Sequence, residues 1–120
     1  MVLADFLSYL KKERGFSAHT IKAYEYDLNR FILFVRHKDQ TNIRKFEDID
    51  RDLIRRYLGF EFDHGFSSKT VARRLAALKS FFNYLMRSER ISDNPAMYVK
   101  SPKISQSLPN FIDRKVIDAL

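Results

Sequence analysis

The sequence has 120 residues, 45% of them hydrophobic and 31% charged, which is the composition of one small globular domain and excludes a disordered chain. Its 22 lysine and arginine residues against 15 acidic ones give a net charge of +7, which favours an anionic partner such as nucleic acid or a membrane surface. Cysteine is absent, as is typical of the reducing cytoplasm, and the first strongly apolar stretch, Phe31 to Val35, is too short to cross a bilayer. We therefore expect a cytoplasmic protein with no membrane partner.

Three glycines, three prolines and no sustained alternation of apolar and polar residues predict an all-α fold. A first helix is expected from about Leu3 to Arg14, with Gly15 ending it. A second helix should begin at the cap Ser17 and end near Arg36. The inward residues predicted for the first helix are Phe6, Leu7 and Leu10.

The second half of the chain is expected to form two more helices. Asp50 should cap a third helix that ends near Asp63, with Gly65 stopping it. Ser67 should cap a fourth helix that ends near Ser88. The aromatic residues of the third helix that we assign to the core are Tyr57, Phe60 and Phe62.

The sequence after the fourth helix predicts the end of a domain. Ser92-Asp93-Asn94-Pro95-Ala96 should start a short helical turn, and Ser101-Pro102-Lys103 should break it. We therefore expect a helical domain over residues 1–100, a linker over 101–109 and, over 110–120, an amphipathic helix that begins a further domain. On this interpretation the chain is the front piece of a longer protein.

One sequence pattern occurs twice, fifty residues apart. Gly15-Phe16-Ser17-Ala18-His19-Thr20 returns as Gly65-Phe66-Ser67-Ser68-Lys69-Thr70, and the apolar positions that follow keep the same register. Each copy opens a helix, so the repeat unit is expected to be a helical hairpin.

The second and fourth helices are each predicted to have an apolar face and an opposite face of small and basic residues. On the second helix that opposite face comprises His19, Lys22, Ala23, Tyr26 and Arg30. On the fourth it comprises Lys69, Ala72, Arg73, Ala76, Ser80 and Asn83. Six lysine or arginine residues lie between positions 65 and 90 against one acid, so most of the net charge is on this segment.

Such a face suits duplex DNA, because lysine and arginine neutralise phosphates or reach the acceptor edge of guanine while alanine and serine let the backbone approach the groove. Ser17, Thr20, Ser67 and Thr70 lie at helix starts, where free N–H groups favour a phosphate. Each serine is first of all expected to be an N-cap, and the threonines equally fit a capping turn. The alternative for the charge run is a solvated helix face.

No catalytic, metal or cofactor site is predicted, and no small-molecule substrate is expected. The three histidines are scattered, without cysteine or clustered carboxylates at ligand spacing. No phosphate loop or nucleophile motif is present. Arg74 lies toward the apolar side of its helix, where we expect it either to snorkel or to pair with an acid.

Taken in order, these residues resemble the N-terminal core-binding domain of tyrosine site-specific recombinases and phage-type integrases, most closely the Xer (XerC/XerD-like) branch. The resemblance covers nearly the whole chain. It rests on Phe16 to Tyr24 with Asp27, Leu28 and Phe31, and on Ser67 to Thr70 with Arg73 to Leu85.

The resemblance implies a SAM-like four-helix bundle of two crossed helical hairpins with a short C-terminal helical extension, forming half of a clamp around double-stranded DNA. It implies that the chemistry resides in a separate catalytic domain, so this chain would bind DNA in integration or chromosome segregation without cleaving it. It also implies contacts of the first and third helices with other recombinase subunits in a synaptic tetramer. The residues that match DNA-contacting positions of relatives are His19, Thr20, Lys22, Lys69, Thr70 and Arg73.

Two other functions use the same basic face. A free-standing helical DNA-binding regulator would end naturally at Leu120. A protein-interaction module would present the face to an acidic partner and would lack a salt-dependent affinity for ordinary duplex DNA.

Overall fold

The computed structural model describes residues 2–38 and 46–101. Its α-helices are α1 (Val2–Lys12), α2 (Ala18–Leu33), α3 (Arg51–Asp63) and α4 (Ser68–Arg87). The chain continues from α2 into a π-helix, η1 (Phe34–Lys38), and a short 3-10 helix, η2 (Phe46–Asp48), precedes α3. The described residues contain no strand, which confirms the predicted all-α fold.

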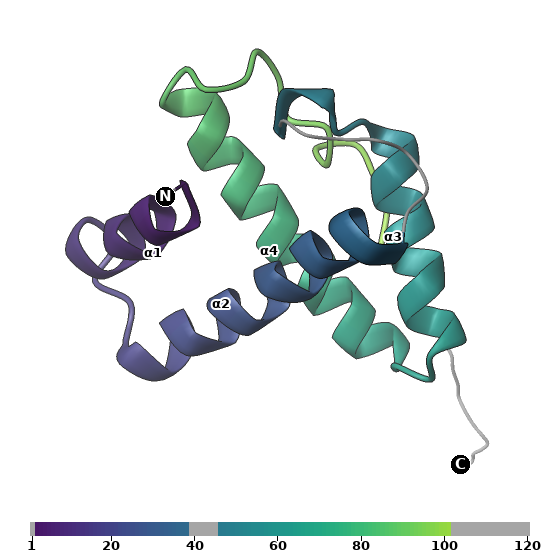
Figure 1. The fold of residues 1–120 in the computed structure, drawn as a ribbon. Helices are drawn as coiled ribbons and strands as arrows, with labels where there is room; N and C mark the ends of the chain where they lie inside the picture. Colours follow the sequence, from purple (N-terminus) through teal and green to yellow (C-terminus); the bar gives the residue numbers. More distant parts are fainter. Residues whose placement is uncertain (1, 39–45, 102–120) are drawn as a thin grey trace.

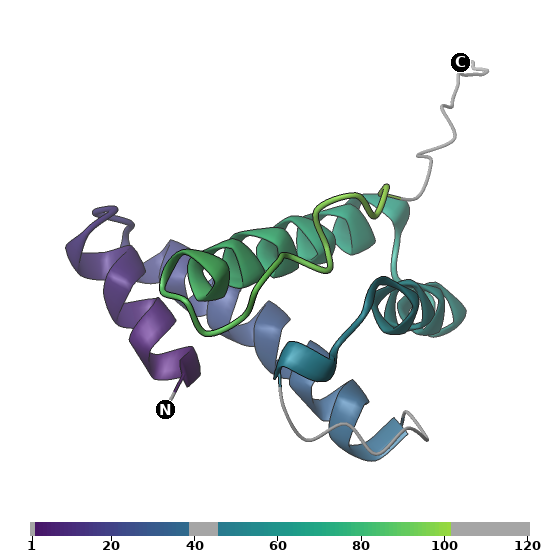
Figure 2. The ribbon, with the colours of Figure 1, turned by 90° about the horizontal axis from the view of Figure 1, so that it is seen from above.

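The four helices form two hairpins that cross. Figure 1 shows α1 on one side and α3 on the other, with α2 and α4 running between them and crossing near the middle of the molecule. Seen from above in Figure 2, α1 and α3 lie at opposite ends of this crossing. The starts of α2 and α4 are consequently far apart, one on either side of the point where the two helices meet.

The two copies of the sequence repeat begin their helices with the same local geometry. Ser17 and Ser67 have φ/ψ values of −68/159° and −69/159°, and each accepts a hydrogen bond from the backbone N–H three residues later. Asp50 caps α3 in the same manner, accepting from the Leu53 N–H at 2.8 Å. The three predicted caps are thus confirmed. Gly15 and Gly65 precede the repeated caps with positive φ values of 66° and 88°.

Aromatic rings fill the core on both sides of the crossing. Phe6 of α1 is fully buried, and its ring lies 5.3 Å from that of Phe81. On the other side the ring of Phe31 of α2 packs against Tyr57 of α3 and Phe82 of α4. Its centroid is 5.2 Å from that of Tyr57 and 6.2 Å from that of Phe82. Each inward face predicted from helical spacing therefore contributes to one continuous core.

Of the predicted core residues, Phe6, Leu10 and Tyr57 are fully buried, whereas Leu7 and Phe60 are partly buried. The assignment of Phe62 to the core was wrong, because its exposed fraction is 38%. The buried stripe of α3 ends instead with Glu61, which is fully buried one position earlier.

Residues after α4 pack back against the bundle. The Asn94 side chain is buried; its amide donates to the Lys79 carbonyl at 3.0 Å, and its oxygen accepts from the Ala96 N–H at 2.9 Å. Successive turns over 94–99 then bury Ala96 and Val99. The expected break after Ser101, the linker and the helix over 110–120 lie outside the described residues.

Alanine substitution at the two exposed glycines of the second hairpin should have opposite effects on the free energy of unfolding. At Gly65 the positive φ of 88° is unfavourable for any residue with a Cβ, so Gly65→Ala should lower the free energy of unfolding by about 1 kcal/mol. Gly59 lies inside α3 with open space around it, so Gly59→Ala should raise that free energy by up to about 1 kcal/mol. Urea denaturation followed by circular dichroism measures both. Destabilisation by both substitutions would contradict the backbone explanation.

Candidate nucleic-acid interface

The small and basic faces predicted for α2 and α4 lie on the surface. His19, Lys22, Lys69 and Arg73 are exposed, and Thr20 and Thr70 are partly exposed. Leu28 and Phe31 of α2, like Val71, Leu75 and Leu78 of α4, are buried on the opposite faces. Both helical faces were therefore predicted correctly, although the two groups of candidate residues occupy separate helix starts (Figure 1).

The two helix starts each present a threonine hydroxyl. Ser17 Oγ accepts from the Thr20 N–H at 3.2 Å and donates to Thr20 Oγ1 at 3.1 Å. Ser67 and Thr70 repeat this pair of hydrogen bonds at 3.1 Å each. Because the serine hydrogen is used in this way, each threonine hydroxyl keeps its own hydrogen for an external acceptor. The serines are confirmed as N-caps.

Arg73 is fixed at the crossing by a buried carboxylate. Its Nε and Nη2 atoms donate to the two Asp27 oxygens at 3.0 and 2.8 Å, in the fork geometry that suits guanidinium and carboxylate. The Asp27 side chain is 3% exposed and that of Arg73 is 55% exposed. The hydrogen bond to Asp27 raises the pKa of Arg73 further above its usual value. Arg73 is therefore a surface cation whose position is set by Asp27 of α2.

Beneath this pair, Glu61 of α3 is fully buried and accepts from three side chains. Arg30 of α2 donates to its two oxygens at 2.8 and 2.6 Å, Tyr57 donates at 3.0 Å, and Arg74 of α4 donates to the same carboxylate. Burial acts to raise the pKa of Glu61, but the hydrogen bonds from Arg30, Tyr57 and Arg74 prevail and lower it. Burial, together with the Glu61 charge, raises the pKa of the Tyr57 hydroxyl.

Arg74 connects the two buried acids. Its side chain is 3% exposed, and it bonds Glu61 and lies 3.4 Å from Asp27. The Phe66 ring, from the second copy of the repeat, covers the Arg74 guanidinium at 4.1 Å from its centroid and that of Arg30 at 4.7 Å. Of the two predictions for Arg74, pairing with an acid is therefore correct.

These pairs reduce the positive charge available to a ligand. Of the six basic residues between positions 65 and 90, Arg73 and Arg74 pair with the buried acids and Arg90 pairs with Asp5 at 3.0 Å. Lys69, Lys79 and Arg87 form no ion pair within the described residues. The candidate interface is thus less basic than the residue count suggested.

The sequence interpretation missed Asp27 and Glu61 as partners of these arginines. Glu61 had a recognisable signal, since it follows Ile54, Tyr57 and Leu58 at helical spacing and so falls on the buried stripe of α3. A charge at such a position needs a partner in the core. Which arginines supply that partner depends on the packing of three helices, and no local pattern identifies them.

Other kinds of site find no support in the described part of the chain. No three histidine, cysteine, aspartate or glutamate residues there are grouped to hold a metal ion. No helix there is both long enough and apolar enough to cross a membrane.

Comparison with known proteins identifies similar chains. The model of the phage integrase N-terminal SAM-like domain matches residues 3–89. The tyrosine recombinase XerC of Herpetosiphon aurantiacus is 37% identical over 118 residues, which are 98% of this chain and 38% of that protein. The tyrosine recombinase XerD of Listeria monocytogenes serovar 1/2a is 38% identical over 120 residues, covering 99% of this chain and 39% of that protein. No solved structure matches.

Removing the buried charge of Glu61 should destabilise the fold. Glu61→Gln leaves the Arg30 and Arg74 guanidinium groups without their shared counter-charge, and we expect a loss of about 3–5 kcal/mol in the free energy of unfolding. Asp52→Asn is the matched control on the same helix, because Asp52 is 70% exposed and pairs with Arg56 at the surface; it should lose less than about 1 kcal/mol. Urea titrations at neutral pH measure both. Equal losses would contradict a structural role for Glu61.

Lowering the pH should remove the contribution of Glu61 to the free energy of unfolding. Because its pKa in the folded state is below the ordinary value of 4.5, its contribution to stability is fully present above that pH and is lost as the pH falls through the lower folded-state pKa. The difference in unfolding free energy between the wild-type protein and Glu61→Gln should therefore shrink as the pH is lowered from about 6 to about 3. A difference that stays constant over this range would show that the pKa of Glu61 is the same in the folded and unfolded states, and would contradict stabilisation of its charge by Arg30, Tyr57 and Arg74.

Proposed function

The chain belongs to the family of phage integrase N-terminal SAM-like domains, and we propose that it is the duplex-DNA-binding clamp domain of a tyrosine recombinase. In this role it grips one half-site during site-specific recombination, in DNA integration or chromosome segregation, and orients the part of the protein that performs the chemistry.

The observation that best supports this proposal is that each of the two crossed helices has an exposed face of small and basic residues. Lys22 and Lys69 are exposed near the starts of α2 and α4 and have no ion-pair partner within the described residues. These two helix starts lie on opposite sides of the crossing (Figure 1). Ala23 and Ala76 are exposed on the same faces and leave room for a close approach. Two cationic helix faces separated in this manner suit the curved, phosphate-lined surface of a duplex.

Each candidate residue has a distinct role in the proposal. Lys22 and Lys69 neutralise phosphates, and the Thr20 and Thr70 hydroxyls donate to phosphate oxygens at the positive ends of their helices. His19 adds a further polar contact beside Thr20. Arg73 is already held by Asp27, so it offers its remaining guanidinium hydrogens to DNA from a fixed position.

The whole protein is proposed to be a tyrosine recombinase, as XerC and XerD relatives are named. This chain spans less than two fifths of the length of those relatives, so catalysis is assigned to the remainder. In the family that this sequence resembles, a tyrosine of the catalytic domain attacks the scissile phosphate. The chain described here would bind DNA without cleaving it.

Neighbouring subunits of a synaptic tetramer are proposed to contact α1 and α3. The outer side of α3 supports this assignment, since Phe62 is 38% exposed and Tyr98, beside it in the same surface hollow, is 78% exposed. Exposed aromatic residues of this kind are enriched where proteins meet.

Lysine substitutions on the two helix faces test the proposal. Lys22→Ala and Lys69→Ala should each weaken binding to a fluorescently labelled duplex and lower the salt slope of log K by about 0.9, because each removes one phosphate contact. Lys11→Ala is the matched control, since Lys11 is exposed on α1 and belongs to neither helix face. Anisotropy titrations at several salt concentrations measure the affinity and its slope.

Two results would contradict the proposal. One is the absence of duplex binding by the folded protein at low salt, which would instead favour a protein-interaction module. The other is an equal loss for Lys11→Ala, which would show that only net charge matters. Arg73→Ala is unsuitable for this test, because it leaves Asp27 buried with a single long contact to Arg74 and so affects folding as well.

A further inference from the structure

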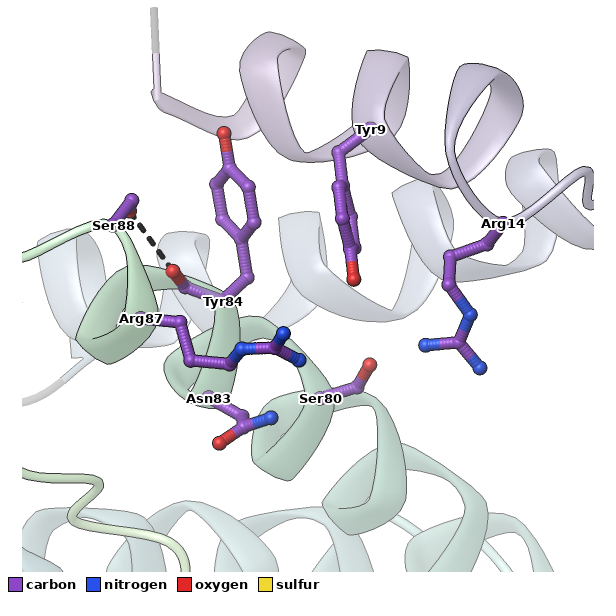
Figure 3. Close-up of a pocket in the computed structure, with 7 residues that line it drawn as sticks. All are labelled: Tyr9, Arg14, Ser80, Asn83, Tyr84, Arg87 and Ser88. Atoms are coloured by element: carbon purple, nitrogen blue, oxygen red, sulfur yellow. Dashed lines mark hydrogen bonds between the residues drawn. The ribbon is translucent and has the colours of Figure 1, made fainter.

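A surface hollow of about 250 Å³ lies between the end of α1 and the last turns of α4, and none of its lining residues has a role in the function proposed above. Figure 3 shows the guanidinium groups of Arg14 and Arg87 extending toward it from opposite sides, with the Tyr9 and Ser80 hydroxyls between them. The Tyr9 and Tyr84 rings, 5.0 Å apart, form its aromatic wall.

The hollow has unbalanced positive charge. Neither Arg14 nor Arg87 forms an ion pair within residues 2–38 and 46–101, and no acidic residue lines the hollow. The Arg14 guanidinium lies over the Phe16 ring, 5.1 Å from the ring centroid. Arg87 lies at the C-terminal end of α4, where the helix dipole amounts to only about half a negative charge, so two arginines outweigh it.

The hydrogen-bonding groups also lack protein partners. No hydrogen bond to the side chains of Tyr9, Ser80 or Asn83 is formed by the described residues, whereas Ser88 donates to the Tyr84 carbonyl at 2.9 Å. Two guanidinium forks and two hydroxyls supply donors from several directions. A tetrahedral anion with several oxygens, such as a phosphate group, fits this set of donors.

The position of the hollow relates it to the proposed DNA face. Lys69, Arg73, Ala76, Ser80, Asn83 and Arg87 follow one another at alternating spacings of four and three residues, so they form a single stripe along α4. From Lys69 to Arg87 the stripe is about 27 Å long, whereas the major groove is about 12 Å wide. A helix that enters the groove near its start and runs across it therefore reaches a phosphate strand near its end.

We propose that Arg14, Ser80 and Arg87, with the Tyr9 hydroxyl, bind one backbone phosphate of duplex DNA at the C-terminal end of α4. This inference rests on the proposed function and extends it, because it adds a contact made by the loop between α1 and α2. The site positions the duplex across α4 and reads no base, since phosphate contacts set register without specifying sequence.

Paired substitutions test whether both arginines bind the same phosphate. Arg14→Gln and Arg87→Gln should each weaken duplex binding, and the double variant should lower the salt slope of log K by about 0.9, the value for a single phosphate. Because the two residues bind one phosphate, the fold-loss of duplex affinity in the double variant should be smaller than the product of the fold-losses in the two single variants. Ser80→Ala should weaken binding a few-fold without changing the slope, since it removes a neutral donor.

Arg55→Gln is the matched control, because Arg55 is exposed on α3 and lines a different hollow beside Tyr98 and Lys100. Anisotropy titrations of a labelled duplex are read alongside a circular dichroism melt of each variant. If the double variant behaves like Arg55→Gln while Lys69→Ala still loses affinity, the phosphate site is wrong and the proposed function stands. A slope reduction of about 1.8 would indicate two separate phosphates and overturn the shared site. Failure of the wild-type protein to bind would overturn both.

Discussion

The buried carboxylate of Glu61 is the constraint on which the arrangement of three helices depends. It lies on α3, yet its donors come from α2, α3 and α4, and Arg74 extends the network to Asp27. Apolar side chains tolerate small shifts of one helix along another, whereas a buried charge needs its donors at hydrogen-bond distance. We interpret the network as fixing the register of the crossing, so that one relative placement of the two hairpins satisfies every buried charge.

The same network determines which cations remain for a ligand. Asp27 and Glu61 form ion pairs with Arg30, Arg73 and Arg74, although all three arginines belong to helices with a basic outer face. What remains outside is a small set of separated charges rather than a dense basic patch. Separated charges suit recognition that depends on spacing, because each can meet a different phosphate of the duplex. Rigidity at the crossing and sparse charge at the surface therefore have one cause.

Local signals in the sequence were sufficient to predict the helices and to separate their buried faces from their exposed ones. Ser17, Asp50 and Ser67 were identified as caps because a cap requires only its own helix start, and helical spacing alone separated the buried from the exposed sides of α2 and α4. Contacts between helices were beyond such signals. The partner of Arg73 is 46 residues away in sequence, and the exposure of Phe62 follows from how α3 meets its neighbours. The arginine-lined hollow likewise joins a loop to the far end of α4.

The internal repeat is symmetric where the helices begin and asymmetric where they cross. Ser17 and Ser67 have the same cap geometry, but fifty positions after Tyr24 the chain has Arg74, and fifty after Asp27 it has Ala77. Helix α2 thus supplies the acid at the crossing and α4 supplies the cations that meet it. On α4 the residues without an ion-pair partner among the described residues are Lys69, Lys79 and Arg87. On α2 the one lysine or arginine without such a partner is Lys22. The two helices therefore begin alike but differ in free charge, and under the proposed function the electrostatic attraction to a duplex would come mainly from α4.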